Sequence, residues 1–155
     1  MAKKQTDAEL VSNRRAFHEY EILDTYEAGI ALLGSEIKSL RNHGGSLQDA
    51  YVLIDDSGKV ILKNSSIAPY RFGGAFNHAE KRERVLLLHK REILKLRSAS
   101  QEKGLTLIPI AMYLKSGYVK VKIGIAKGKR SFDKRAALKE REHKRDIDRA
   151  LKERD

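Results

Sequence analysis

Two apolar segments late in the chain are the clearest strands, and in the second of them apolar and polar residues alternate. Residues 105–114 and 118–127 are rich in Ile, Leu and Val, and a three-residue connection ending in Gly117 separates them. In the second segment, Val119, Val121 and Ile123 alternate with larger polar residues. Those polar positions hold Tyr118, Lys120 and Lys122. A period of two is typical of a strand with one buried face, so we expect an antiparallel hairpin that presents tyrosine and lysine to solvent.

Earlier segments show weaker strand and helix patterns. Residues 20–33, 50–54 and 59–63 read as strands, with further extended chain over 64–70, and residues 34–41 and 89–103 read as helices. Gly29 predicts a bulge or bend in the first strand, Ser35 an N-cap, and Gly104 a C-terminal cap. Residues 85–88 are all apolar, and so short a run fits either a strand or a helix.

These elements predict a fold that is mainly β with flanking helices, a small antiparallel β-barrel of the oligonucleotide-binding type. We expect residues 1–12 to be a disordered N-terminus, 13–129 to form the body, and 130–155 to form a basic C-terminal tail. From Arg130 onward, ten Lys or Arg and seven Asp or Glu fall within 26 residues, with few apolar side chains. Such a segment is expected to be disordered when free and to become helical only on a partner.

Charge indicates the kind of partner. The formal net charge is +11, from 32 basic and 21 acidic residues. So large a basic excess favours a polyanion, either nucleic acid or an anionic membrane surface. The absence of cysteine excludes disulfides and thiolate chemistry. The N-terminus has no apolar region typical of a secretory signal, and no apolar run is long enough to cross a bilayer, so we expect a cytoplasmic protein with no membrane partner.

The sequence offers no recognisable catalytic or metal-binding motif. Its five histidines lack the spacing of metal ligands, and there is no nucleophile elbow. Residues 124–131 imitate a phosphate-binding loop, but the glycines are one residue too close and Ser131 does not follow the lysine. We therefore expect no metal, no cofactor and no enzymatic activity.

Several residues of the body have both a plain and a functional interpretation. Taken alone, Glu27 suits a solvated strand position, Leu87 a core position, and His89 a helix cap. Lys120 and Lys122 fit nucleic acid better, because they share a face with Tyr118, and basic and aromatic residues together neutralise phosphates and stack on bases. A dense basic cluster adds to this charge; it comprises Lys81, Arg82, Arg84, Lys90, Arg91, Lys95 and Arg97.

Six segments, in order and with matching spacing, make the chain resemble the small protein B family, the SsrA-binding proteins. They are residues 13–20 (NRRAFHEY), 26–30 (YEAGI), 34–41 (GSEIKSLR), 86–93 (LLLHKREI), 120–129 (KVKIGIAKGK) and 133–135 (DKR). The resemblance implies an adaptor that binds the tRNA-like domain of transfer-messenger RNA and carries it to stalled ribosomes for trans-translation. It implies a barrel that contacts this RNA and a tail that becomes helical in the messenger channel.

The resemblance also assigns residues to each partner. It places Glu27, Leu87, His89 and Lys120 against the tRNA-like domain. We add Tyr118 and Lys122 to this predicted RNA-binding group, because they share a strand face with Lys120. For the ribosomal decoding site it implies a group in the tail: Lys129, Arg130, Phe132, Asp133, Lys134 and Arg135. Some family members have Asn where this chain has His89, and His where it has Phe132. We expect the protein to be a monomer. Two other functions stay open: a general ribosome-associated or single-strand RNA-binding structural protein and, less favoured, an RNA-processing enzyme.

Overall fold

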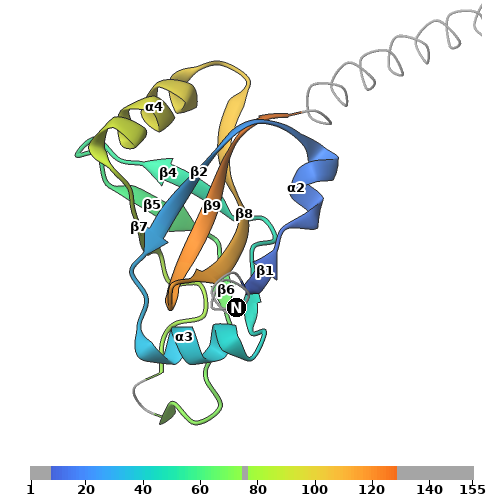
Figure 1. The fold of residues 1–155 in the computed structure, drawn as a ribbon, viewed down its shortest axis with the longest axis vertical. Coiled ribbons are helices and arrows are strands. Elements are labelled where there is room, and N and C mark those ends of the chain that lie inside the picture. The colour runs from blue at the N-terminus through green and yellow to red at the C-terminus, as the bar shows by residue number, and fades with distance from the viewer. Residues whose placement is uncertain (1–7, 75–76, 129–155) are drawn as a thin grey trace, which may run out of the picture.

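The computed structural model describes residues 8–74 and 77–128, and there the chain is mainly β with helices on its flanks (Figure 1). The strands are β1 (Glu9–Ser12), β2 (Tyr20–Ile30), β3 (Gly45–Ser46), β4 (Tyr51–Ile54), β5 (Val60–Lys63), β6 (Ser66–Ile67), β7 (Arg84–Leu87), β8 (Leu105–Lys115) and β9 (Tyr118–Gly128). The helices are α2 (Arg14–Glu19), α3 (Gly34–Arg41) and α4 (Lys90–Gln101).

Seven strands form one antiparallel sheet in the order β1-β8-β9-β2-β7-β5-β4, and β3 pairs with β6 in a separate ribbon. The sheet curls until β4 lies near β8, but the two strands form no ladder. The sheet is therefore not closed into the β-barrel that we expected, whereas the mainly β fold with flanking helices is confirmed. The outer edge of β8 is partly taken by β1, which pairs with Ala111 to Tyr113, while its other edge pairs with β9.

The hairpin of β8 and β9 is confirmed, with ten paired positions running from Leu105 with Lys127 to Lys115 with Tyr118. Its tight turn holds Ser116 at φ 52° and Gly117 at φ 82°. Two successive residues with positive φ match the twist of a two-residue hairpin turn. The alternation in β9 is also as expected, with Val121 and Ile123 entirely buried while the tyrosine and lysine positions face outward.

Helices α3 and α4 lie at opposite ends of the curled sheet (Figure 1). Leu40 of α3 and Leu96 of α4 are completely buried and join the same apolar cluster as Leu62 and Val121 of the sheet. Both α3 and α4 have a glutamate at the third helical position whose carboxylate accepts the backbone N–H of the N-cap residue; the pairs are Glu36 with Leu33 and Glu92 with His89. This arrangement satisfies a backbone donor that a helix start otherwise leaves free.

The N-terminal segment differs from the prediction of disorder through residue 12. Residues Glu9–Ser12 form β1 on the free edge of β8, and Val11 is buried. Asn13 then ties the chain to the same strand, because its backbone N–H donates to Ile110 O and its side-chain amide donates to Pro109 O. Four residues are too short to show a pattern, so their order depends on the edge that β8 supplies.

Two local predictions near β2 and α3 are wrong. The bulge of β2 lies between Ile22 and Asp24, and Gly29 pairs in regular register. The N-cap of α3 is Leu33, while the Ser35 hydroxyl lies 2.8 Å from the buried His78 ring. The short apolar run before α4 is resolved as strand β7, and the strand predicted to reach residue 33 ends at Ile30.

A buried ion cluster joins α3 to β7. Glu36 and Arg84 are both 0% exposed, and Arg84 Nε donates to Glu36 Oε2 at 2.6 Å. The Arg84 guanidinium also donates to Ser65 and to the carbonyls of Arg82 and Glu80. Every face of the charge is thus matched by an acceptor, as a buried guanidinium requires.

This burial corrects the expected basic surface of residues 81–97. Arg84 is internal, Arg82 also pairs with Glu36, and Arg97 donates to the carbonyl of Asp55. The cluster is therefore divided between the interior and the surface, and only part of it is available to a polyanion. A run of basic residues does not reveal this division, since burial depends on which strand faces α3.

Within residues 8–74 and 77–128, no helix is both long and apolar enough to cross a membrane.

Candidate nucleic-acid interface

Four strands bring the predicted body residues into one place on the outer face of the sheet. The register aligns Tyr113 of β8 with Lys120 of β9, Lys120 with Gly29 of β2, and Gly29 with Leu87 of β7. Glu27 lies two residues before Gly29 on β2, which places its side chain on the same face. Residues separated by up to 93 positions in the sequence (Glu27 to Lys120) thus become neighbours.

Gly29 lies between Lys120 and Leu87 in this register and has no side chain to fill the space between them. A Cβ at Gly29 would lie 3.4 Å from Leu87 Cβ, so the missing side chain leaves space between β9 and β7. An open hollow of about 380 Å³ occupies the site. Its lining consists of Glu27, Gly29, Leu87, Leu88, His89, Glu92 and Lys120. All four body residues assigned by family resemblance therefore share one concave surface.

Glu27 is fixed in this hollow as an anion. The Tyr113 hydroxyl donates to Glu27 Oε2 at 2.6 Å, and Lys115 Nζ lies 3.2 Å from the same oxygen. The Tyr113 hydrogen bond, with smaller contributions from Lys115 and Lys120, holds the pKa of the Glu27 carboxyl below its usual value. The carboxylate thus remains an acceptor at neutral pH, with lone pairs available for a donor on a bound molecule.

His89 stands at the rim of the hollow as the N-cap residue of α4. The backbone supports the cap, since His89 N–H donates to Glu92 and His89 O accepts from the N–H of Glu92. The imidazole is exposed and forms no hydrogen bond with the residues that the structure describes. The expected helix-cap position is confirmed, but the ring itself is free to donate or accept toward a ligand.

An apolar hollow of about 210 Å³ adjoins the first and shares Gly29, Leu87 and Lys120 with it. Leu87 is 59% exposed and Tyr118 is 71% exposed, so both present apolar surface to solvent. The plain interpretation of Leu87 as a core residue is therefore wrong. Lys122 is also exposed on the same face of β9. Exposed apolar surface beside lysines suits a nucleotide whose base packs on Leu87 or Tyr118 and whose phosphate contacts a lysine.

Sequence reasoning missed three contributors to this site. Tyr113 and Lys115 orient Glu27 from across β9, and Gly29 provides the space. The expected three-residue connection would pair Tyr113 with Val119, whereas the observed two-residue turn pairs Tyr113 with Lys120, so the predicted hairpin did not place Tyr113 at the site. Nothing in the pattern linked that tyrosine to β2, because the order of the strands is a tertiary property.

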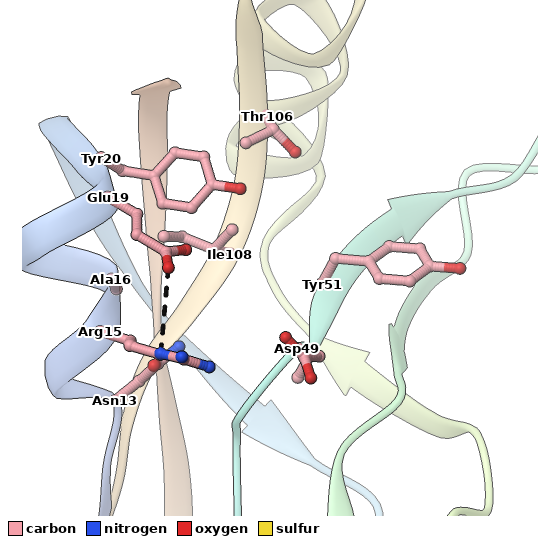
Figure 2. Close-up of a pocket in the computed structure, with 10 residues that line it drawn as sticks. Asn13, Arg15, Ala16, Glu19, Tyr20, Asp49, Tyr51, Thr106 and Ile108 are labelled. Carbon is pink, nitrogen blue, oxygen red and sulfur yellow. Dashed lines mark ion pairs between the residues drawn. The ribbon is translucent and has the colours of Figure 1, made fainter. Parts of the chain in front are cut away.

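A different cavity, of about 230 Å³, lies beside α2 (Figure 2). Arg15 and Glu19 of α2 form an exposed ion pair there, with 3.9 Å between Arg15 Nε and Glu19 Oε1. Tyr20, Thr106 and Ile108 form one wall, and Asp49 lies across the cavity from α2 (Figure 2). None of the predicted binding residues lines it.

The predicted decoding-site residues of the tail, Lys129 to Arg135, lie outside the described residues. Across the part of the chain that the structure describes, no group of three or more His, Cys, Asp or Glu is arranged to hold a metal ion.

Comparison with known proteins agrees with the resemblance. The family model "SmpB protein" matches residues 10–153. An SsrA-binding protein of Protochlamydia amoebophila (strain UWE25) is 60% identical over 150 residues, which cover 97% of each chain. One from Staphylococcus aureus (strain Newman) is 49% identical over 154 residues, or 99% of each chain.

A solved structure described as "tmRNA-SmpB: a journey to the center of the bacterial ribosome" has a similar fold. The TM-score is 0.66 with 46% sequence identity, over 80% of this chain and 85% of that one. The family match extends beyond Gly128 and so includes most of the C-terminal segment as well as the sheet. With its fold, its sequence and nearly its whole length in agreement, the chain belongs to the SmpB protein family.

Proposed function

We propose that this protein is an RNA-binding adaptor of trans-translation. It binds the tRNA-like domain of transfer-messenger RNA through the hollow of Glu27, Leu87, His89 and Lys120, and delivers that RNA to stalled ribosomes in the bacterial cytoplasm. The observation that carries the proposal is that these four residues, distant in sequence, line one concave surface. The relatives' name and the ribosomal complex of the similar structure support the same partners.

The geometry suits recognition of folded RNA. Lys120, with Lys122 beside it, provides positive charge for the phosphate backbone, which supplies most of the affinity in such complexes. Glu27 and His89 provide hydrogen-bonding groups for base edges or the 2′-hydroxyl, and exposed Leu87 and Tyr118 provide surface for unstacked bases. The protein acts in this scheme by binding and positioning RNA, without chemistry of its own and without a cofactor.

The tail takes a second role in the proposal. Lys129, Arg130, Phe132, Asp133, Lys134 and Arg135 act at the decoding site, and the segment to Asp155 becomes helical in the messenger channel. Within it, Glu140 with Lys144 and Asp148 with Lys152 are acid-before-base pairs at i,i+4, worth roughly 0.2–0.5 kcal/mol each in a helix. So small a gain fits a segment that orders only on its partner.

Purification of the protein from cells with its bound RNA, followed by sequencing, tests this division of labour. We expect both the full chain and a truncation after Arg130 to enrich transfer-messenger RNA. Only the full chain should support tagging of nascent chains on stalled ribosomes, because the truncation lacks Phe132 to Arg135. The full chain with Phe17→Ala, an exposed change outside the proposed site, provides a matched control for RNA enrichment.

Two outcomes would contradict the scheme. Enrichment of bulk ribosomal RNA without transfer-messenger RNA would instead fit a general ribosome-associated protein. Loss of transfer-messenger RNA from the truncated protein would mean that the body does not bind it alone.

A further inference from the structure

A tight turn after β6 presents an aromatic ring to solvent, away from the site described above. Phe72 is 76% exposed, more than any other large hydrophobic side chain in residues 8–74 and 77–128. The turn projects beyond α3, at the end of the molecule opposite to the C-terminal end of β9 (Figure 1). Exposing a phenylalanine ring forgoes its favourable transfer from water, so Phe72 offers apolar surface that a bound molecule would cover.

Hydrogen bonds hold this turn in one shape. The backbone N–H of Gly73 donates to Tyr70 O at 2.9 Å, which leaves Arg71 and Phe72 at the two corners. The Asn77 side chain closes the base of the loop, because its amide donates to Tyr70 O and its carbonyl oxygen accepts Tyr70 N–H. A Cβ at Gly73 would lie 2.8 Å from Asn77 Cγ, so this clamp requires glycine there.

Cations and aromatic rings alternate across the surface of the turn. Lys38 Nζ lies 5.5 Å from the centroid of the Tyr70 ring, and the Tyr70 and Phe72 rings meet edge to face at 5.7 Å. The Arg71 guanidinium lies 5.6 Å from the centroid of the Phe72 ring. Both distances from cation to ring are within reach of a cation–π contact. The group of Lys38, Tyr70, Arg71 and Phe72 is here called the aromatic turn.

The aromatic turn itself carries only positive charge. No acidic residue occurs between residues 64 and 79, and Glu36 of α3 is fully buried against Arg82 and Arg84. Lys38 and Arg71 are exposed, so their charges face solvent. Two neighbouring rings, Tyr70 with Lys38 against it and Phe72 with Arg71 against it, complement a base with its phosphates. These two cations would gain nothing from an apolar partner that carries no negative charge.

We propose that the aromatic turn binds an unpaired nucleotide of RNA. Phe72 stacks on the base, and Arg71 and Lys38 contact the flanking phosphates. A paired base is excluded because its faces are covered by neighbours in the helix, so the turn distinguishes single-stranded or looped-out RNA from a duplex. This inference goes beyond the proposed function, since the turn shares no residue with the hollow around Glu27.

Fluorescence of a Phe72→Trp variant of the full chain tests the proposal. The native sequence contains no tryptophan, so the new indole is the only one and reports stacking at that position alone. We expect saturable quenching by a single-stranded RNA of about eight nucleotides and much weaker quenching by the same sequence annealed as a duplex. A Leu53→Trp variant is the matched control, because Leu53 is also exposed but lies on β4 close to Asp55 and Asp56.

Two further variants measure the energetic contribution. Phe72→Ala is expected to weaken single-strand binding about tenfold, while Arg71→Gln should lower the slope of log K against log salt by about 0.7. Circular dichroism should be unchanged for both, since the two side chains are exposed. An indole at position 72 that is not quenched at saturating single-stranded RNA, or is quenched equally by duplex, would overturn the proposal. Transfer-messenger RNA binding through Glu27 would be unaffected by either result.

Discussion

Replacement of Arg84 with methionine is expected to lower the free energy of unfolding by about 3–5 kcal/mol. Methionine fills much of the volume but leaves the Glu36 carboxylate buried without its strongest partner, since Arg84 Nε donates to it at 2.6 Å. The acceptors on Ser65, Arg82 and Glu80 also lose their donor. Urea denaturation of the full chain, followed by circular dichroism, measures the loss.

An exposed pair in the same part of the sheet provides the control. Lys63 Nζ lies 3.4 Å from Glu83 Oε1, and the Glu83 side chain is 61% exposed. Lys63→Met should therefore change stability by no more than about 1 kcal/mol. Equal losses for the two variants would show that burial of the Arg84–Glu36 pair is not what makes it important.

The pH dependence of stability follows from the same carboxylate. Burial alone would raise the pKa of Glu36, but hydrogen bonds from Arg82, the Leu33 N–H and Arg84 outweigh it and hold the pKa below its usual value. A carboxyl whose pKa is depressed on folding stabilises the fold above its unfolded pKa and loses that contribution as pH falls through the folded value. Acid should therefore destabilise the native protein more than it destabilises Arg84→Met.

Charge reversal at Lys120 is expected to reduce affinity for the tRNA-like domain at least tenfold. Lys120→Glu removes a cation from the middle of the hollow and places a second carboxylate beside Glu27. It should also reduce the slope of log K against log salt by about 0.7–0.9, because one fewer phosphate is neutralised and its counterion is no longer released. Filter binding of the full chain at several salt concentrations measures both quantities.

Lys103→Glu is the matched control for this charge change. Lys103 is exposed just after α4 and lies outside the hollow, so the variant has the same net charge as Lys120→Glu. We expect Lys103→Glu to lower affinity much less than Lys120→Glu does, because it changes only the overall electrostatic potential of the protein. If the two variants weaken binding equally, net charge governs the affinity and the hollow is not the specific site.

The sequence alone predicted the elements whose signals are local. Apolar and polar residues alternate in β9 from Tyr118 to Ile123, β8 is a long apolar segment, and the connection is short, so both strands and the hairpin could be predicted. The hairpin of β4 and β5 and helices α3 and α4 were found for similar reasons. Strand β1 was missed because four residues have no pattern of their own, and the extent of closure could not be predicted because it depends on which edges remain unpaired.

The site depended more on resemblance than on pattern. Leu87 lies within a run of four apolar residues, 85–88, and only the tertiary structure determines that Leu86 is buried while Leu87 is exposed. Arg84 is in a run of surface-like charges, yet strand alternation directs it inward against Glu36. The carboxylate of Glu27 becomes a plausible binding group only once Tyr113 and Lys115 are seen to hold it. In each case the deciding contact joins strands that are far apart in the sequence.

Comparison of two RNAs at equal salt tests the central claim most directly. The full chain is titrated with the isolated tRNA-like domain of transfer-messenger RNA and with a plain stem-loop of equal length and charge. The proposed recognition by Glu27, Leu87, His89 and Lys120 predicts at least tenfold tighter binding to the tRNA-like domain, and loss of most of that preference in a Glu27→Ala, His89→Ala double variant that remains folded. Equal affinity for the two RNAs would contradict it, because phosphate attraction alone would then account for binding.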